Sequence, residues 1–305
     1  MRIAFIGFGE AARAFVETLR EAQGLQFAAF DILTSRGRDD AVRAEAARLG
    51  VRVCTSPAEA VEAADWVFSA VTAADSLDAG RSVADVMKPG QVFIDINSVS
   101  AGRKQDTARL VTAGGAAYLD MAVMAPVHPK CHRTPVLIAG PDAVEMGHRL
   151  GLLGFDLEIA GQDVGAATTI KMLRSMFVKG LEAITVQTLL AARAAGRLDE
   201  IHTSLSKSFP GLGWPEFPKY LAERVTTHGV RRAAEMRESA VTMSELGFEA
   251  GKDMALAVAA LQQEIGDLGL RLDPAGTLES LYDTVLGARD GRMDRKPTEF
   301  KEDAA

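Results

Sequence analysis

Short apolar runs alternate with helical stretches along the first half of the chain. Eight of these runs have the length and apolar content of buried strands, and turn residues or helical spacing separate them. They lie at residues 2–6, 26–30, 51–54, 66–70, 92–96, 117–124, 134–139 and 156–159. Because strands that alternate with helices form βαβ units, the pattern predicts an α/β fold with a parallel sheet.

The pattern changes after Gly161. A long segment rich in Ala, Leu and Met covers residues 165–195 with few helix breakers, and no convincing strand follows it. Further helical segments lie at 198–208, 215–227, 230–246, 251–267 and 277–286. We therefore predict a sheet domain at residues 1–162, an all-α domain at 163–288, and a charge-rich, flexible tail at 289–305.

The composition excludes several classes of protein. Apolar residues make up 48% of the 305 residues and charged residues 25%, as in an ordinary globular protein. A net charge of −7 without a basic run argues against a nucleic-acid partner. Two cysteines, Cys54 and Cys131, cannot form a disulfide framework, and they and the five histidines lack metal-ligand spacing, so we expect no metal. Without a signal peptide or membrane span, the chain is predicted to be cytoplasmic.

The first predicted strand runs directly into Gly7-Phe8-Gly9-Glu10-Ala11-Ala12. Gly7 allows a sharp turn, Gly9 leaves room for a pyrophosphate, and Ala12 brings the following helix close to the sheet. The start of that helix offers free N–H groups to phosphate oxygens, and Asp31, at the end of the second strand, suits a ribose. This arrangement predicts a Rossmann-type dinucleotide site. We expect the cofactor to contact Gly7, Phe8, Gly9, Glu10, Ala11 and Asp31.

The choice between NAD and NADP depends on Asp31 and the residues after it. The Asp31 carboxylate would repel a 2′-phosphate, which favours NAD. Arg36 and Arg38 follow shortly afterwards and could fold over such a phosphate, although loop arginines are more often simply solvated. The sequence favours NAD slightly.

Two further loops follow predicted strands and should line the same crevice, because strand ends carry the ligand-facing loops in such a sheet. They are residues 71–74 and 97–100. Val71, Thr72 and Asn97 are the expected cofactor contacts there. Ordinary loop and helix-capping chemistry explains these segments equally well, since serine is a good N-cap residue.

Lys171 is the strongest candidate for acid–base chemistry. It lies near the start of the long helical segment, among small and apolar residues, where desolvation could lower a lysine pKa into a useful range. From composition alone, an exposed helix lysine is the more common explanation. The choice between the two needs evidence from other parts of the chain.

Four ordered segments together resemble the β-hydroxyacid dehydrogenase and 6-phosphogluconate dehydrogenase superfamily. They are Gly7-Phe8-Gly9, residues 92–98, residues 118–123 and the Lys171 segment. The resemblance covers roughly residues 1–195 and implies a Rossmann domain, an all-helical second domain, an NAD(P) cofactor and Lys171 as general acid/base. In the helix pattern of the family, this chain keeps Gly165 and Lys171. It has Ala167 for a second glycine and Arg174-Ser175 for paired asparagines.

The chain departs from the family where a serine and glycine amides bind the substrate carboxylate. Met124 stands at the serine position and Pro126, which has no N–H, at a glycine position. We hypothesise that Arg174, with a residue of the basic loop 128–133 such as His132, replaces the missing contacts. A solvated basic turn is an equally good interpretation of that loop. Ser98 and Ser175 would also position the substrate.

The segment 227–238 resembles a bacterial branch of the superfamily that has a distinct C-terminal domain. His228, Arg231, Arg232 and Glu235 share a helix face there, and surface ion pairs are the simplest interpretation. Since family members dimerise through this domain, the alternative is a contribution to the active site, including that of a partner subunit. A homodimer through the helical domain is therefore expected. Lys252-Asp253 also resembles a cofactor-proximal pair of some relatives.

These observations predict an NAD(P)-dependent oxidoreductase that interconverts a hydroxy compound and its carbonyl by hydride transfer. One alternative is an imine reductase, although those enzymes usually carry Asp or Tyr where Lys171 stands. The other is a nicotinamide-binding regulatory protein without activity, which the missing asparagines would suggest. The substrate itself is not predicted.

Overall fold

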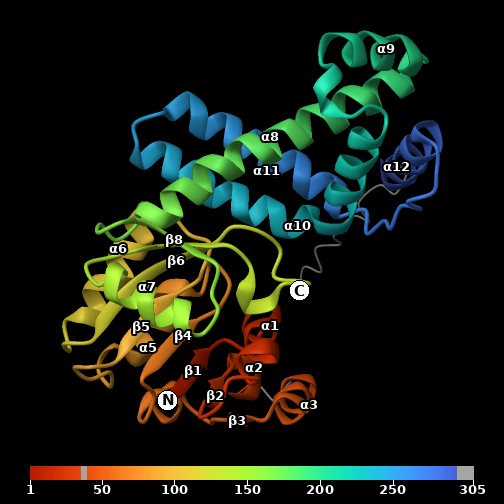
Figure 1. The fold of residues 1–305 in the computed structure, drawn as a ribbon. Helices are drawn as coiled ribbons and strands as arrows, with labels where there is room; N and C mark the ends of the chain where they lie inside the picture. Colours follow the sequence, from red (N-terminus) through yellow and green to blue (C-terminus); the bar gives the residue numbers. More distant parts are fainter. Residues whose placement is uncertain (36–39, 294–305) are drawn as a thin grey trace, which may run out of the picture. The chain divides into compact units, whose positions relative to one another are not determined.

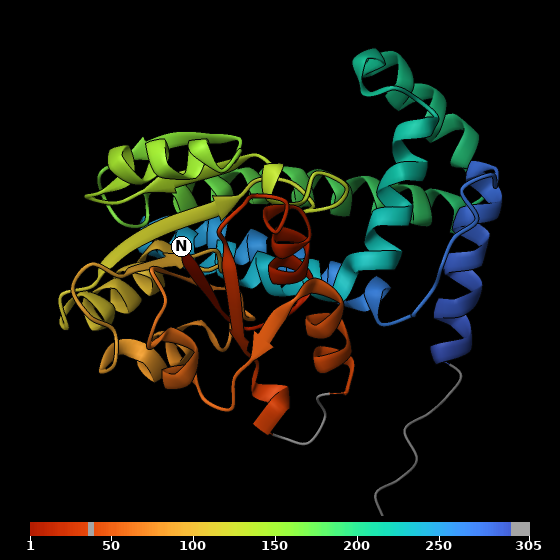
Figure 2. The same ribbon diagram turned by 60° about the horizontal axis from the view of Figure 1, so that its bottom comes forward.

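The computed structural model describes residues 1–35 and 40–293 of the chain. It contains one eight-stranded sheet in the order β3-β2-β1-β4-β5-β6-β7-β8, drawn in red to yellow-green in Figure 1 and Figure 2. All eight predicted strands are present, with ends that differ by at most a few residues. They are β1 (Arg2–Ile6), β2 (Gln26–Phe30), β3 (Val51–Val53), β4 (Trp66–Ser69), β5 (Val92–Asp95), β6 (Ala117–Val123), β7 (Val136–Ala139) and β8 (Leu157–Gly161).

The sheet is parallel except at one pair of strands. β7 pairs antiparallel with β6, and β8 is again parallel to β7. The strand order reverses at β1, which lies between β2 and β4, so the loops after β1 and β4 leave the sheet at neighbouring positions. This switch point is where open α/β sheets bind their ligands.

Apolar cores on both faces explain why the strands are apolar without alternation. Phe5, Phe68 and Ile94 belong to one core, which contains residues of α1, α3 and α7. Val67 and Phe93, their neighbours along the strands, belong to the other core, with residues of α4, α5 and α6. The helices are α1 (Glu10–Leu19), α2 (Ile32–Ser35), α3 (Asp40–Leu49), α4 (Pro57–Val61), α5 (Ser76–Ala84), α6 (Ala101–Thr112) and α7 (Ala143–Leu152).

The second half of the described chain is helical, as predicted. Its elements are α8 (Ala166–Ala194), α9 (Leu198–Ser208), α10 (Glu216–Glu245), α11 (Glu249–Gly266) and α12 (Leu278–Met293). Two predicted helices around Gly229 form the single helix α10. Gly229 lies against α11, where a Cβ atom would come within 2.3 Å of the Gln262 carbonyl oxygen. The glycine therefore serves a close helix crossing and does not interrupt the helix.

The chain forms two compact units, one of residues 1–174 with 238–252, the other of residues 175–237 and 253 onward. The first unit extends past the predicted boundary at residue 163, because Asp120 of the sheet holds the first turn of α8. The second unit has its own apolar core around Leu189, Leu221 and Tyr282. α12 continues to Met293, so the predicted tail begins inside a helix and its remainder lies outside the described residues. Among the described helices, none is long and apolar enough to cross a membrane.

Candidate active site

Gly7 makes the turn after β1. Its φ is +87°, and a Cβ atom would come within 2.5 Å of the Ala70 carbonyl oxygen. The Gly7 N–H donates to the Phe30 carbonyl oxygen at 2.8 Å, which joins the ends of β1 and β2. A side chain at this position would push the loops after β1 and β4 apart. The fold itself therefore requires glycine here, independently of any ligand.

Gly9 is different, because the space beside it is open. A Cβ atom there would meet no protein atom within 4 Å. Gly9 is the N-cap of α1, has no side-chain cap, and is exposed together with Glu10. The start of α1 therefore offers its first N–H groups to a ligand, which is the arrangement that binds phosphate.

Asp31 connects the end of β2 to the glycine turn. Its Oδ2 accepts a hydrogen bond from the Phe8 N–H at 2.8 Å, and its Oδ1 accepts one from the Leu33 N–H at 2.9 Å. Each carboxylate oxygen has a second lone pair available to a ribose hydroxyl. Arg36, the predicted phosphate contact, lies outside the described residues.

Arg13 was not among the residues predicted from the sequence. Its Nε donates to the Phe8 carbonyl oxygen at 2.8 Å, and its guanidinium lies 5.7 Å from the centre of the Phe8 ring. This places a positive charge beside the glycine turn. Arg13 could have been predicted, because it directly follows the glycine motif, in the helix whose start is expected to bind the phosphate.

Asn97 connects the loops after β4 and β5. Its Nδ2 donates to Ser69 Oγ at 2.9 Å, and its Oδ1 accepts from the Val71 N–H at 2.8 Å. The side chain is buried and holds the two loops together, and its contact with the nicotinamide stays a prediction. Val71 is half-buried beside it. Thr72 is exposed and donates to Asp75, so it is available at the surface of the loop.

A buried charge network lies under the ends of β5 and β6. Lys104 of α6 is fully buried, and its Nζ lies 2.6 Å from the Asp95 carbonyl oxygen, 3.0 Å from Asp95 Oδ1 and 3.3 Å from Asp120 Oδ1. The Tyr118 hydroxyl donates to Asp95 Oδ2 at 2.7 Å. Burial of this hydroxyl raises the Tyr118 pKa well above its usual value, so the group stays protonated as a donor.

Asp120 carries this network into α8. Its Oδ2 accepts from the N–H groups of Gly165 at 3.2 Å and Thr168 at 3.1 Å, which satisfies the start of the helix. Burial raises the pKa of Asp120, and the charge of Lys104 and the Thr168 N–H oppose that rise. Thr168 Oγ1 in turn donates to the Val99 carbonyl oxygen at 2.5 Å. The first turn of α8 is thus fixed to both β6 and the loop after β5.

Lys171 and Ser98 meet at the end of this arrangement. Lys171 lies in α8 just after Thr168, and its Nζ donates to Ser98 Oγ at 2.6 Å. Both side chains are half-buried. The structure therefore brings together the predicted acid/base and one predicted substrate contact, at the carboxyl edge of the sheet where the glycine turn also lies.

The last turns of α10 hold the same loop from another side. Glu238 Oε2 accepts from the Ser100 N–H at 3.1 Å, and Glu245 Oε1 accepts from Ser100 Oγ at 2.7 Å. Burial raises the pKa of Glu238. Ser239 Oγ donates to the carbonyl oxygen of Met172, the residue after Lys171, at 3.3 Å. No pattern in the sequence indicated these contacts, because they join positions far apart in the chain.

His132, a predicted substrate contact, lies inside the core. It is 1% exposed; its Nδ1 shares a hydrogen bond with Thr18 Oγ1 at 2.5 Å, and its Nε2 lies 3.0 Å from the Leu153 carbonyl oxygen. Its ring packs edge-on against Phe155, and burial lowers its pKa. A histidine with both nitrogens bound inside the core has no free atom for a ligand.

The other predicted substrate contacts differ in exposure. Met124 is half-buried and packs against a small cluster that includes Ala139 and Ala167. Arg174 is exposed, and Ser175 is buried at the start of the second unit. The side chains of Met124 and Arg174 are therefore those accessible to a substrate.

Two of the charged residues predicted to share a face of α10, Arg232 and Glu235, form ion pairs inside the second unit. Arg232 forms a buried ion pair with Glu182 of α8, and Gln262 of α11 also donates to Glu182 at 3.3 Å. Glu235 pairs with Lys179 at 2.7 Å. These pairs connect the helices of the unit and are not simply surface charges. Lys252, the other candidate of this half, pairs with Glu249 at 2.8 Å.

Two family profiles match the chain. Residues 2–98 match the family described as NADP oxidoreductase coenzyme F420-dependent, and residues 192–265 match a domain of unknown function, DUF1932. The first match covers the sheet from β1 to the Ser98 loop. The second covers most of the helical half.

Solved structures resemble the chain over nearly its whole length. A conserved hypothetical protein from Sinorhizobium meliloti 1021 is 34% identical, with a TM-score of 0.76 and 96% of each chain covered. A conserved protein of unknown function, described as structurally similar to 3-hydroxyacid dehydrogenases, is 27% identical with a TM-score of 0.69, over 88% of this chain and 100% of that one. The 3-hydroxyisobutyrate dehydrogenase of Mycobacterium tuberculosis shares the fold, at 16% identity and a TM-score of 0.72, over 93% and 98%.

These matches agree with the motifs and with the geometry around Lys171. A Rossmann-type sheet is followed by a helical region that has its own family profile, and relatives described as dehydrogenase-like share both parts. The chain belongs to the β-hydroxyacid dehydrogenase and 6-phosphogluconate dehydrogenase superfamily of NAD(P)-binding oxidoreductases, in the branch with a distinct C-terminal helical domain.

Proposed function

We propose that this protein is an NAD(P)-dependent dehydrogenase or reductase that interconverts a hydroxy compound, such as a hydroxy acid, and its carbonyl. The observation that carries the proposal is the 2.6 Å contact between Lys171 Nζ and Ser98 Oγ. It lies at the carboxyl edge of the sheet, the edge from which the open glycine turn also leaves. An acid/base group and a hydroxyl donor at that place suit a reacting carbonyl oxygen.

The residues present fit a nicotinamide dinucleotide. The space beside Gly9 and the uncapped start of α1 suit its pyrophosphate, and Asp31 suits a ribose, with a slight preference for NAD. When bound, the cofactor supplies or accepts the hydride. Val71 and Thr72 belong to the loop that would face its nicotinamide half.

Lys171 and Ser98 would handle the proton. In reduction, the Lys171 ammonium gives a proton to the carbonyl oxygen as hydride reaches the carbonyl carbon, and the amine regains its proton from solvent. In oxidation, the neutral amine takes the hydroxyl proton. Ser98, within hydrogen-bond distance of the same nitrogen, orients the substrate oxygen. Arg174 would bind an acidic group of the substrate, since Met124 and Pro126 replace the usual carboxylate contacts.

A substrate panel with a lysine variant tests this proposal. Hydroxy acids, sugar acids, aromatic alcohols and imines are screened by absorbance at the nicotinamide band with both NAD and NADP. We expect turnover of a CH–OH or C=O compound, which Lys171→Met abolishes while leaving NAD(P)H affinity unchanged. Lys207→Met, which removes an exposed lysine of α9, is the matched control and should keep full activity.

The other outcomes of the panel are equally informative. Turnover that survives Lys171→Met refutes the mechanism. Turnover of imines alone assigns an imine reductase, and tight cofactor binding without turnover of any class assigns a regulatory protein. For the substrate anion contact, Arg174→Ala should raise the substrate KM with unchanged cofactor affinity, and an unchanged KM would exclude Arg174 from that role.

A further inference from the structure

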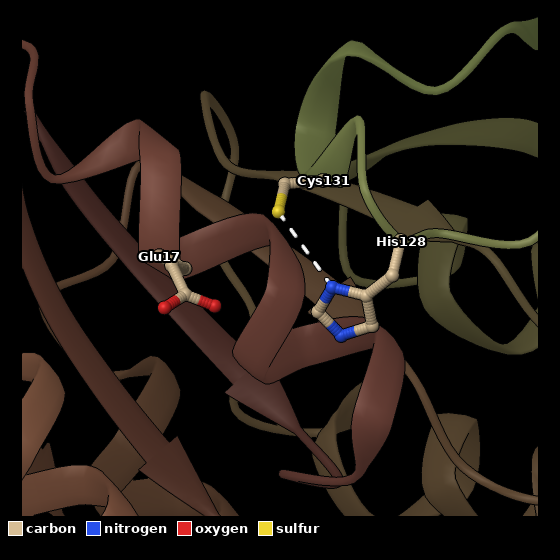
Figure 3. Close-up of side chains that lie close together, drawn as sticks. All are labelled: Glu17, His128 and Cys131. Carbon is tan, nitrogen blue, oxygen red and sulfur yellow. Dashed lines mark hydrogen bonds between the residues drawn. The ribbon is translucent and has the colours of Figure 1, made fainter.

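A group of metal-ligand side chains lies apart from the Lys171 site. Glu17 comes from the last turn of α1, and His128 and Cys131 come from the loop between β6 and β7 (Figure 3). Their potential ligand atoms all lie within 4.8 Å of one another. Figure 3 shows the three side chains converging from two segments, with the Cys131 sulfur directed toward the His128 ring.

The backbone at Cys131 is held in an unusual conformation that directs the thiol into this group. Cys131 has a φ of +57° and is the one residue other than glycine with a positive φ in the described part of the chain. Such conformations cost about 1–3 kcal/mol and persist where the surroundings fix them. Here the Cys131 N–H donates to the Val127 carbonyl oxygen at 2.5 Å, and the Thr134 N–H donates to the Cys131 carbonyl oxygen at 3.1 Å.

The sulfur is already close to a nitrogen ligand. Cys131 Sγ lies 4.0 Å from His128 Nδ1 and 3.6 Å from the Pro129 carbonyl oxygen, and the residue is 5% exposed. Ligand atoms around a tetrahedral Zn²⁺ are roughly 3.3–3.8 Å apart, given the usual Zn–S and Zn–N lengths. The distance between Cys131 Sγ and His128 Nδ1 is therefore only slightly longer than this range, and the His128 side chain is exposed.

The charges around the group favour a cation on the Glu17 side. Glu17 lies in the last turn of α1, at the negative end of the helix dipole. One carboxylate oxygen, Oε1, is 3.3 Å from Arg48 Nη1, which orients the group and leaves Oε2 as a ligand. Arg133, two residues after Cys131, is itself paired with Glu21 at 3.5 Å, and Lys130, between the two loop ligands, is exposed.

We propose that Glu17, His128 and Cys131 form a binding site for Zn²⁺, with water as the fourth ligand. A thiolate, an imidazole and a carboxylate suit zinc better than calcium or magnesium, which prefer oxygen ligands. The site would fasten the loop between β6 and β7 to α1. No metal was expected from the sequence, because the ligands of this site come from segments that are distant in the chain.

Metal binding at this site would release a proton. The Cys131 thiol must lose its proton to bind zinc, so affinity should increase as pH rises.

The test is a Co²⁺ titration of the full-length, tag-free protein under reducing conditions, followed by Zn²⁺ competition. A thiolate–cobalt bond gives a near-ultraviolet charge-transfer band, and tetrahedral cobalt gives strong visible bands. We expect both bands with one Co²⁺ per chain, and their loss on addition of Zn²⁺. Cys131→Ser should remove the charge-transfer band, and His128→Ala should weaken binding by about tenfold or more.

Two variants serve as matched controls. Cys54→Ser removes the other cysteine, and His148→Ala removes an exposed histidine of α7; both should bind Co²⁺ like the unchanged protein. Because Cys131 is buried and its serine variant could fold poorly, His128→Ala on the surface gives an independent result. Absence of the charge-transfer band in the unchanged protein, or equal cobalt affinity in His128→Ala, overturns the proposal. Neither result depends on the dehydrogenase activity.

Discussion

Replacing Lys104 with Met should strongly destabilise the first unit. Lys104 is fully buried and contacts two carboxylates, Asp95 and Asp120, that are fully buried as well. Methionine fills a similar volume but leaves both carboxylates without their cation. Removal of one partner from a buried ion pair typically costs about 3–5 kcal/mol. We expect a loss of that size in the free energy of unfolding at neutral pH.

The loss should depend on pH in a defined direction. Burial already raises the pKa of Asp120, and without Lys104 that pKa rises further. A carboxyl whose folded pKa lies above its unfolded value binds more protons when folded, so its contribution is complete below the unfolded value and is lost as pH rises. The deficit of Lys104→Met should therefore be largest at neutral pH and smaller in mildly acidic buffer.

Urea unfolding measures both effects. Trp66 is buried in the same sheet, so its fluorescence in a Trp214→Phe background follows the first unit. Lys88→Met removes an exposed lysine and should change stability by no more than about 0.5 kcal/mol. Adding Asp120→Asn to Lys104→Met should restore part of the loss. A deficit below about 1 kcal/mol, or one that is the same at every pH, would refute the account of a buried charge network.

Further predictions concern the glycine turn and α10. Gly7→Ala should cost about 1–3 kcal/mol of stability, because alanine must adopt a positive φ and meets the Ala70 carbonyl. Gly9→Ala should leave the unfolding midpoint unchanged and weaken NAD(P)H binding in a fluorescence titration; equal affinity would place the pyrophosphate elsewhere. Glu238→Gln should become more stable relative to the unchanged protein as pH rises above 4.5. Burial raises the pKa of Glu238, so the contribution of Glu238 to folding stability is lost with rising pH. Parallel stability curves would show that Glu238 titrates normally in the folded protein.

The sequence predicted the fold well, because the signals for it are local. Each strand is a continuous apolar run, and Gly7 and Gly9 mark the turn into α1. Predictions from local signals failed where the role of a residue depends on its contacts with distant parts of the chain. Gly229 was interpreted as a helix break, whereas a crossing with α11 explains it. His132 resembled a solvated loop residue, whereas the Phe155 ring and the Leu153 carbonyl enclose it.

The candidate site was predictable only in part, for the same physical reason. Lys171 stood out only when the family resemblance was added to its place in a small-residue helix start, and its partner could not be read from spacing. The contacts of Glu238 and Lys104 join elements whose adjacency is decided by strand order and helix packing. In the sequence, Lys104 is one charge in a polar helix, and no pattern marks it as fully buried.

The contacts around Lys171 indicate that contacts within the protein hold the proposed proton-transfer pair, Lys171 and Ser98, in place. Asp120 fixes the backbone of α8 one turn before Lys171, and Ser239 fixes it one residue after. Thr168 holds Val99, and α10 holds Ser100, so the loop carrying Ser98 is also bound on its far side. Lys171 and Ser98, the partners of the 2.6 Å contact, therefore both lie on restrained backbone. Substrate binding needs little further ordering of these two side chains. Breaking any one of these contacts should therefore lower the reaction rate. Cofactor binding should be unchanged, because none of these contacts involves the glycine turn.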